Sequence, residues 1–145
     1  MTKSFKPRKD LSSFRVDFQV AKKLKVLGFS EVTTAYWEIL IDNPNNRRES
    51  ILSTNQMENN WNNDKWFIYS APTRAEVLEW FRRVFGYYIY IIPRFDGFDG
   101  SQHFCHYSIF KEGAKESCDI NGDGSYLFEE AENEAINEVL NFLKP

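Results

Sequence analysis

Apolar residues recur every three or four positions in three segments of the chain, which is the spacing of one face of a helix. The first segment covers about 18–27, and its apolar positions are Val20, Ala21, Leu24 and Leu27. Asp17 is placed to cap the first turn, because its carboxylate can accept a hydrogen bond from a free backbone N–H. Gly28 is placed to end the helix, because glycine adopts the left-handed conformation at little cost.

The second helical segment is predicted from Thr73 to about Phe85, with Gly86 as its end. Thr73 and Glu76 have the spacing of a capping box, in which each side chain bonds the backbone amide of the other residue. The third segment covers about 128–143. Its apolar stripe consists of Phe128, Ala131, Ala135, Ile136, Val139, Leu140 and Leu143. The chain is therefore predicted to end in an amphipathic helix.

Four short segments rich in aromatic and β-branched residues predict strands, at 35–41, 66–69, 87–92 and 104–110. The first is apolar on both faces, so we expect it in the middle of its sheet. The element order αββαββα predicts an α+β fold. The simplest architecture is a two-layer sandwich, in which three helices cover about four mainly antiparallel strands.

The segment 42–65 has a different composition from the rest of the chain. It holds eight asparagines, one proline and few large apolar residues. Asparagine favours turns, so we predict an Asn-rich loop over 42–65. Trp61 lies within it, and we expect this side chain to fasten the loop to the body of the protein.

Length and composition point to one domain over 1–145. Apolar residues make up 42% of the chain, which is enough for a buried core. No apolar run approaches the roughly 20 residues of a membrane helix, and no apolar segment follows the basic start, so we expect neither a membrane span nor a secretory signal. Two cysteines make no disulfide framework. The prediction is a cytoplasmic protein with reduced cysteines.

Charge is distributed unevenly along the chain. Residues 1–25 hold eight lysines and arginines against two aspartates, whereas residues 112–145 hold nine acids against two lysines. We expect 1–10 to be a basic flexible arm, and its cations Lys3, Lys6, Arg8 and Lys9 are candidates for weak contact with nucleic-acid phosphates. The alternative is that the two ends attract each other in the folded protein or form solvated faces.

Three segments resemble small uncharacterised proteins of Bacteroidetes phages and conjugative elements. Residues 69–82 (YSAPTRAEVLEWFR) are similar to the pattern S-A-P-T-x-x-x-V-x-x-W-L-R, residues 21–29 (AKKLKVLGF) to A-K-x-L-K-x-x-G-F, and residues 128–131 (FEEA) to Y-E-E-A. The resemblance covers most of the chain, but this sequence departs from those proteins at the Asn-rich loop and at 119–127. It implies a mobile-element product in a bacterial cytoplasm, and it carries no activity. Our leading hypothesis is a non-enzymatic accessory or interaction protein with an unknown protein partner.

Residues 119–130 fit the calcium-loop pattern D-x-[DN]-x-[DN]-G-x₅-E. Asp119, Asn121, Asp123 and Glu130 supply oxygens at the spacing that calcium needs, and Gly124 allows the sharp turn. These four oxygen-bearing residues are therefore candidate calcium ligands.

Two observations favour a simpler reading of the same segment. The residues before Asp119 lack the apolar periodicity of an entering helix, and the chain has no second loop to pair with this one. In the simpler reading 119–130 is a polar turn, and Asp123 or Ser125 caps the last helix.

His103, Cys105 and His106, with the distant Cys118, are the residue types of a zinc site. A zinc site needs four converging ligands, but alternation along a strand directs Cys105 and His106 to opposite faces. The same alternation argues against a catalytic pair of a cysteine and a histidine. No catalytic motif rises above chance.

Three tyrosines fall in one predicted strand: Tyr87, Tyr88 and Tyr90. On an open sheet face such rings can stack on nucleic-acid bases. The commoner reading is that they belong to the core and rim of the sheet.

Overall fold

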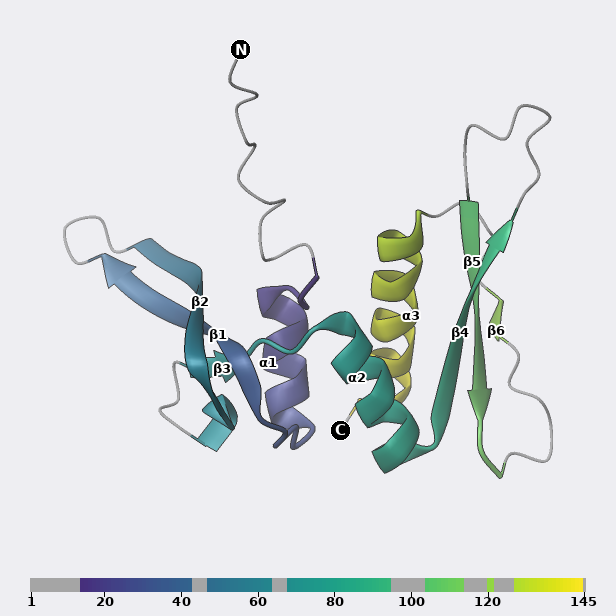
Figure 1. Cartoon of the computed structure of the whole chain (residues 1–145), viewed down its shortest axis with the longest axis horizontal. Coiled ribbons are helices and arrows are strands. Elements are labelled where there is room, and N and C mark those ends of the chain that lie inside the picture. The colour runs from purple at the N-terminus through teal and green to yellow at the C-terminus, as the bar shows by residue number, and fades with distance from the viewer. Residues whose placement is uncertain are drawn as a thin grey trace, which may run out of the picture. The chain divides into compact units, whose positions relative to one another are not determined.

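The computed structural model describes residues 14–42, 47–63, 68–94, 104–113, 120–121 and 127–144. The chain forms two compact units, Met1–Thr73 and Arg74–Pro145. Each unit is a layer of helix on an antiparallel sheet (Figure 1). The sequence predicts one domain over 1–145, and whether the two units fold as one domain stays a prediction.

The first unit contains α1 (Phe18–Val26), β1 (Thr33–Asp42), β2 (Arg47–Asn59), the short 3₁₀ helix η2 (Trp61–Asn63) and β3 (Ile68–Ser70). Its strands lie in the order β2-β1-β3, so β1 is central, as its apolar faces predict. Helix α1 packs on this sheet through Phe18, whose ring meets Trp37 and Tyr69 edge-on at centroid distances of 6.2 and 5.5 Å.

Both predicted ends of α1 are confirmed. The Asp17 carboxylate accepts a hydrogen bond from Val20 N at 2.8 Å, which satisfies one of the free amides of the first turn. After the helix, Gly28 has a φ of 89°, in the left-handed region. The buried residues of α1 are the apolar positions Val20, Ala21 and Leu24.

The Asn-rich loop predicted at 42–65 is wrong over most of its length. Residues 47–59 form β2, which pairs with β1 from Asp42↔Arg47 to Thr33↔Asn59. Strand propensity depends on context, and here the ladder to β1 supplies the backbone partners. Among the described strands β2 lies at the edge of its sheet, and polar side chains such as Thr54 and Glu58 are exposed, so the low apolar content does not prevent pairing.

Two residues after β2 fasten this segment to the unit. Trp61 donates from Nε1 to Thr33 O at 2.8 Å, and its ring lies 4.4 Å from that of Tyr36. The Asn62 amide donates to Phe29 O at 2.9 Å and accepts from Ser70 N at 2.8 Å. The fastening role expected for Trp61 is confirmed, and Asn62 shares it.

The second unit contains α2 (Arg74–Trp80), the π-helical turn η3 (Phe81–Phe85), β4 (Tyr87–Arg94), β5 (Phe104–Lys111), β6 (Ile120–Asn121) and α3 (Phe128–Phe142). Its strands lie in the order β4-β5-β6. Helix α3 lies along one face of this sheet (Figure 1). The core of the unit includes Cys105, Tyr107, Ile109, Ala131, Ala135, Ile136 and Val139.

The second helix begins and ends where the sequence predicts, but its last turn is wider than expected. Gly86 closes η3 with a φ of 72°, and its N–H donates to Arg82 O. A π turn holds more residues than an α turn, so the face that each later side chain occupies is shifted. Within this turn Phe81 is buried, whereas Val84 is 51% exposed.

The α+β class and the antiparallel pairing are confirmed. Over the described residues, the structure differs from the predicted sandwich in having two three-stranded sheets, each with one strand more than expected. The additional strands, β2 and β6, both lie in polar segments, where the pattern of apolar residues carries little signal.

Candidate functional site

A pocket of about 460 Å³ lies between α2 and β4 in the second unit. It is lined by Ala75, Leu78, Glu79, Arg82, Tyr88, Ile89 and Tyr90. The short connection through Gly86 reverses the chain directly after η3, so that residues of α2, η3 and β4 line one pocket. Its volume is within the range of about 300–1,000 Å³ that is common for ligand sites.

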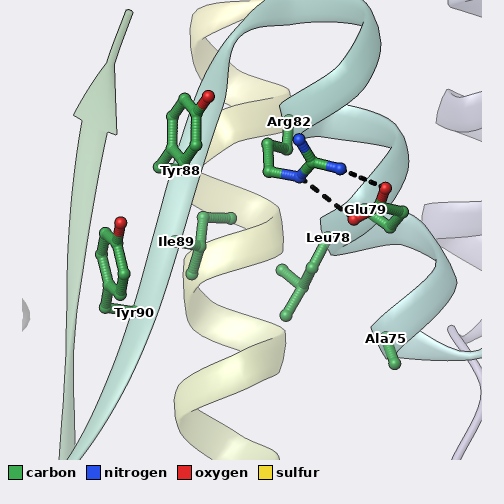
Figure 2. Close-up of a pocket in the computed structure, with 7 residues that line it drawn as sticks. All are labelled: Ala75, Leu78, Glu79, Arg82, Tyr88, Ile89 and Tyr90. Carbon is green, nitrogen blue, oxygen red and sulfur yellow. Dashed lines mark hydrogen bonds and ion pairs between the residues drawn. The ribbon is translucent and has the colours of Figure 1, made fainter.

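The floor of this pocket is apolar and is built from both elements. Leu78 on α2 and Ile89 on β4 point toward one another (Figure 2). Both side chains are half-buried, so part of each is accessible to a ligand. Ala75, one turn before Leu78, lines the pocket without filling it.

A charged pair forms the rim of the pocket. Arg82 binds the Glu79 carboxylate with two donors, Nε to Oε2 at 3.1 Å and Nη2 to Oε1 (Figure 2). The hydrogen bond from Arg82 lowers the pKa of Glu79, and the bond to Glu79, with a smaller contribution from Tyr88, raises the pKa of Arg82. The Glu79 side chain is 52% exposed and that of Arg82 is 44% exposed. An ion pair this accessible to water orients the two side chains but adds little to the stability of the fold.

The tyrosines of β4 are divided between the two faces of the sheet. Tyr87 stacks on Phe142 of α3 at 6.0 Å, so it belongs to the core side. Tyr90, 52% exposed, meets Phe110 edge-on at 5.5 Å, as a diagonal cross-strand pair on the other face. Figure 2 draws Tyr88 and Tyr90 on the opposite side of the β4 ribbon from Ile89. Of the three tyrosines predicted as candidates for stacking on nucleic-acid bases, Tyr88 and Tyr90 therefore line the pocket and lie on the accessible face of the sheet.

Residues Cys105 and His106 follow the predicted strand alternation. Cys105 is buried in the core side of β5 and His106 is half-buried. His106 Nδ1 is enclosed and has no hydrogen-bond partner among the described atoms. His103 and Cys118 lie outside the described residues. Within the described part of the chain, no three His, Cys, Asp or Glu side chains are grouped as metal ligands.

The calcium-loop candidates are only partly described. Asp119 and Asp123 lie outside the described residues, Asn121 is in β6 opposite Ser108, and Glu130 is exposed in the first turn of α3. The residue that caps α3 is Leu127, which makes no side-chain cap hydrogen bond. Asp123 and Ser125, the alternative caps, lie outside the described residues, so both the cap and calcium binding stay predictions.

The basic arm with Lys3, Lys6, Arg8 and Lys9 also lies outside the described residues, so nucleic-acid contact through it stays a prediction. None of the described helices is long and apolar enough to cross a membrane.

The sequence did not reveal the pocket, although one signal for it was present. Glu79 and Arg82 have the i, i+3 spacing of a helical ion pair, and such a pair marks an accessible helix face. That β4 would lie against this same face depends on the turn at Gly86. Comparison with protein-family models, with curated proteins and with solved structures finds no match.

Proposed function

We propose that this chain is a non-enzymatic interaction protein, and that the α2–β4 pocket holds an extended segment of a partner protein. The observation that supports this most directly is the pocket itself: an accessible apolar floor of Leu78, Ile89 and Ala75 with an ion pair at its rim. An apolar anchor side chain entering such a floor is the usual source of affinity in protein recognition.

The rim pair fits a binding role better than a catalytic one. Glu79 and Arg82 already bond each other with two hydrogen bonds, and the pKa of each is moved toward its charged form. A general acid or base needs a pKa near the working pH, and both shifts lead away from it. A fixed charged pair instead orients the polar backbone of a bound segment beside the apolar floor.

The charge of the second unit indicates the kind of partner. Residues 74–145 hold seven lysines and arginines against thirteen aspartates and glutamates, a net charge of −6. A field of one sign attracts partners of the other and speeds their association. We therefore expect the bound segment to alternate lysine or arginine with large apolar residues.

The resemblance to proteins of Bacteroidetes phages and conjugative elements suggests where such a module acts. We propose an accessory role in a mobile element, in a bacterial cytoplasm. The matching motifs include the segment 69–82, which contains α2 and half of the pocket wall.

Fluorescence anisotropy with a labelled basic peptide tests this function. The probe is acetyl-Lys-Val-Lys-Phe-Lys-Val-Lys-amide, and its counterpart has glutamate at every lysine. Leu78→Asp places a charge in the floor, so it is expected to weaken binding at least about tenfold, which corresponds to about 1.4 kcal/mol. The matched control is Val84→Asp, the same kind of change at an exposed site that does not line the pocket.

The two variants are first compared by circular dichroism and melting temperature, so that a folding defect is recognised. Ile89→Ser is a second floor variant if Leu78→Asp does not fold. The proposal fails if the basic probe does not bind the unmodified protein, if the acidic counterpart binds as well, or if both aspartate variants lose binding equally.

A further inference from the structure

We infer that the partner segment binds by adding a strand to the open edge of β4, so that main-chain hydrogen bonds to Ile89 and Ile91 hold it beside the pocket. This inference rests on the proposed function and specifies its geometry. Strand addition to a sheet edge is a common mode of peptide recognition, in which the backbone supplies affinity and alternate side chains supply specificity.

Among the described residues, strand β4 has a neighbouring strand on one side only. The described strands of this sheet lie in the order β4-β5-β6, and β4 pairs with β5 from Tyr87↔Lys111 to Arg94↔Phe104. An edge strand presents unpaired N–H and C=O groups along its outer side. The pocket with α2 lies against the middle of β4, at Tyr88, Ile89 and Tyr90.

The register identifies which backbone groups face outward. Glu112 N donates to Gly86 O at 2.8 Å at the start of the ladder. Because antiparallel pairs alternate between bonded and non-bonded positions, Tyr88 and Tyr90 bond toward β5, and the residues between them face away. The outward groups are those of Tyr87, Ile89 and Ile91.

Pro93 supports the same assignment and limits the length of the added strand. It occupies the next outward position after Ile91, and it has no N–H to donate. Proline is tolerated in a sheet where its nitrogen faces away from the ladder. The pairing surface therefore extends from Tyr87 to Ile91, followed by one further carbonyl.

An added strand brings a side chain directly over the apolar floor. Neighbouring strands lie about 4.8 Å apart, and directly opposed residues place their side chains on the same face. The residue opposite Ile89 thus points to the face of Ile89, where Leu78 and Ala75 line the pocket. This position selects an apolar residue, and its two neighbours in the strand point to the face of Tyr88 and Tyr90.

Charge favours a basic segment over a second copy of this chain. Pairing β4 with β4 of a second molecule brings together two units that each carry a net charge of −6. Like charges held close together oppose association. A lysine-rich strand reduces this charge instead, so the occupant is a basic strand of another protein.

Amide hydrogen exchange followed by NMR tests the inference with the same basic probe. On binding, the amides of Ile89 and Ile91 are expected to slow their exchange at least about tenfold, because each gains a partner. The amides of Tyr88 and Tyr90 already bond β5 and are expected to change little. Probes N-methylated at single positions provide the matched experiment: binding is lost at every second position, where the peptide N–H faces β4, and kept at the positions between.

The outcomes separate this inference from the proposed function. Binding that depends on Leu78 but shows no alternation, either in the protein amides or in the N-methyl series, overturns strand addition and leaves the pocket function standing. Absence of probe binding overturns both. Slow exchange at Ile89 and Ile91 without peptide, in a sample that sediments as a dimer, shows that a second copy occupies the edge and overturns the inference.

Discussion

Arg74 donates from Nε to Oε1 of Glu132 at 3.2 Å, and this ion pair joins α2 to α3 inside the second unit. The two side chains are 6% and 10% exposed, so both charges have lost most of their water. Desolvation makes such a pair a poor source of net stability, but removing one partner leaves the other charge buried and unpaired.

Glu132→Ala is therefore expected to lower the free energy of unfolding by about 3–5 kcal/mol, measured by urea denaturation. Glu134→Ala changes an exposed residue on the same helix and is expected to stay within about 0.5 kcal/mol. Replacing both charges, as in Arg74→Met with Glu132→Leu, is expected to restore most of the loss. A loss below about 1 kcal/mol in Glu132→Ala would contradict this account.

Glu79 is expected to titrate below its ordinary pKa of 4.5, because Arg82 hydrogen-bonds its charged form. Its folded pKa is depressed, so the stability it contributes is present above the ordinary value and is lost as the pH falls through the lowered one. NMR titration of the carboxyl group measures this. Arg82→Gln is expected to return the midpoint toward 4.5, and Arg83→Gln, which removes only the weakest influence, to change it less.

Two glycines with positive φ differ in what surrounds them. A Cβ at Gly86 meets Glu112 Cβ at 3.2 Å, whereas one at Gly28 meets nothing within 4 Å. Gly28→Ala is expected to cost only the backbone strain, about 1–2 kcal/mol. Gly86→Ala is expected to cost more, because the start of the β4–β5 ladder must also move. Chemical denaturation of the two variants side by side gives the comparison, and equal losses would show that the contact is unimportant.

Trp61→Phe is expected to lower the free energy of unfolding by about 1–3 kcal/mol, because it removes the N–H that bonds Thr33 O. The phenyl ring can still contact Tyr36, so the change isolates the hydrogen bond from the ring packing. Val32→Ala, at a residue 52% exposed beside β1, is the control and is expected to change little. If Trp61→Phe were as stable as the unmodified protein, the hydrogen bond from Trp61 to Thr33 O would not contribute to holding this segment in place.

Calorimetric titration with calcium tests the loop at 119–130. If the loop binds the ion, the unmodified protein is expected to give a saturable heat at millimolar affinity or tighter, within the range of such sites. Asp119→Ala and Glu130→Gln are expected to abolish the heat, because they remove the first and the bidentate last ligand. Heat that persists in both variants, or no heat in the unmodified protein, would reduce the motif to a turn.

The sequence by itself determined the elements whose signals are local. The cap at Asp17, the left-handed ends at Gly28 and Gly86, and most of the apolar stripe of α3 each depend on residues within a few positions of one another, so they were predicted correctly. The exception is Phe128, the first residue of the predicted stripe, which is 55% exposed. The alternation along β5 was predicted for the same reason.

Tertiary structure decided what depends on distant partners. Strand β2 exists because β1 completes its backbone hydrogen bonds, and Asn62 is fixed because Phe29 and Ser70 lie on either side of its amide. The pocket belongs to this second class: nothing in the sequence distinguishes Leu78 and Ile89 from other apolar residues, and the chain reversal at Gly86 is what brings them to one pocket.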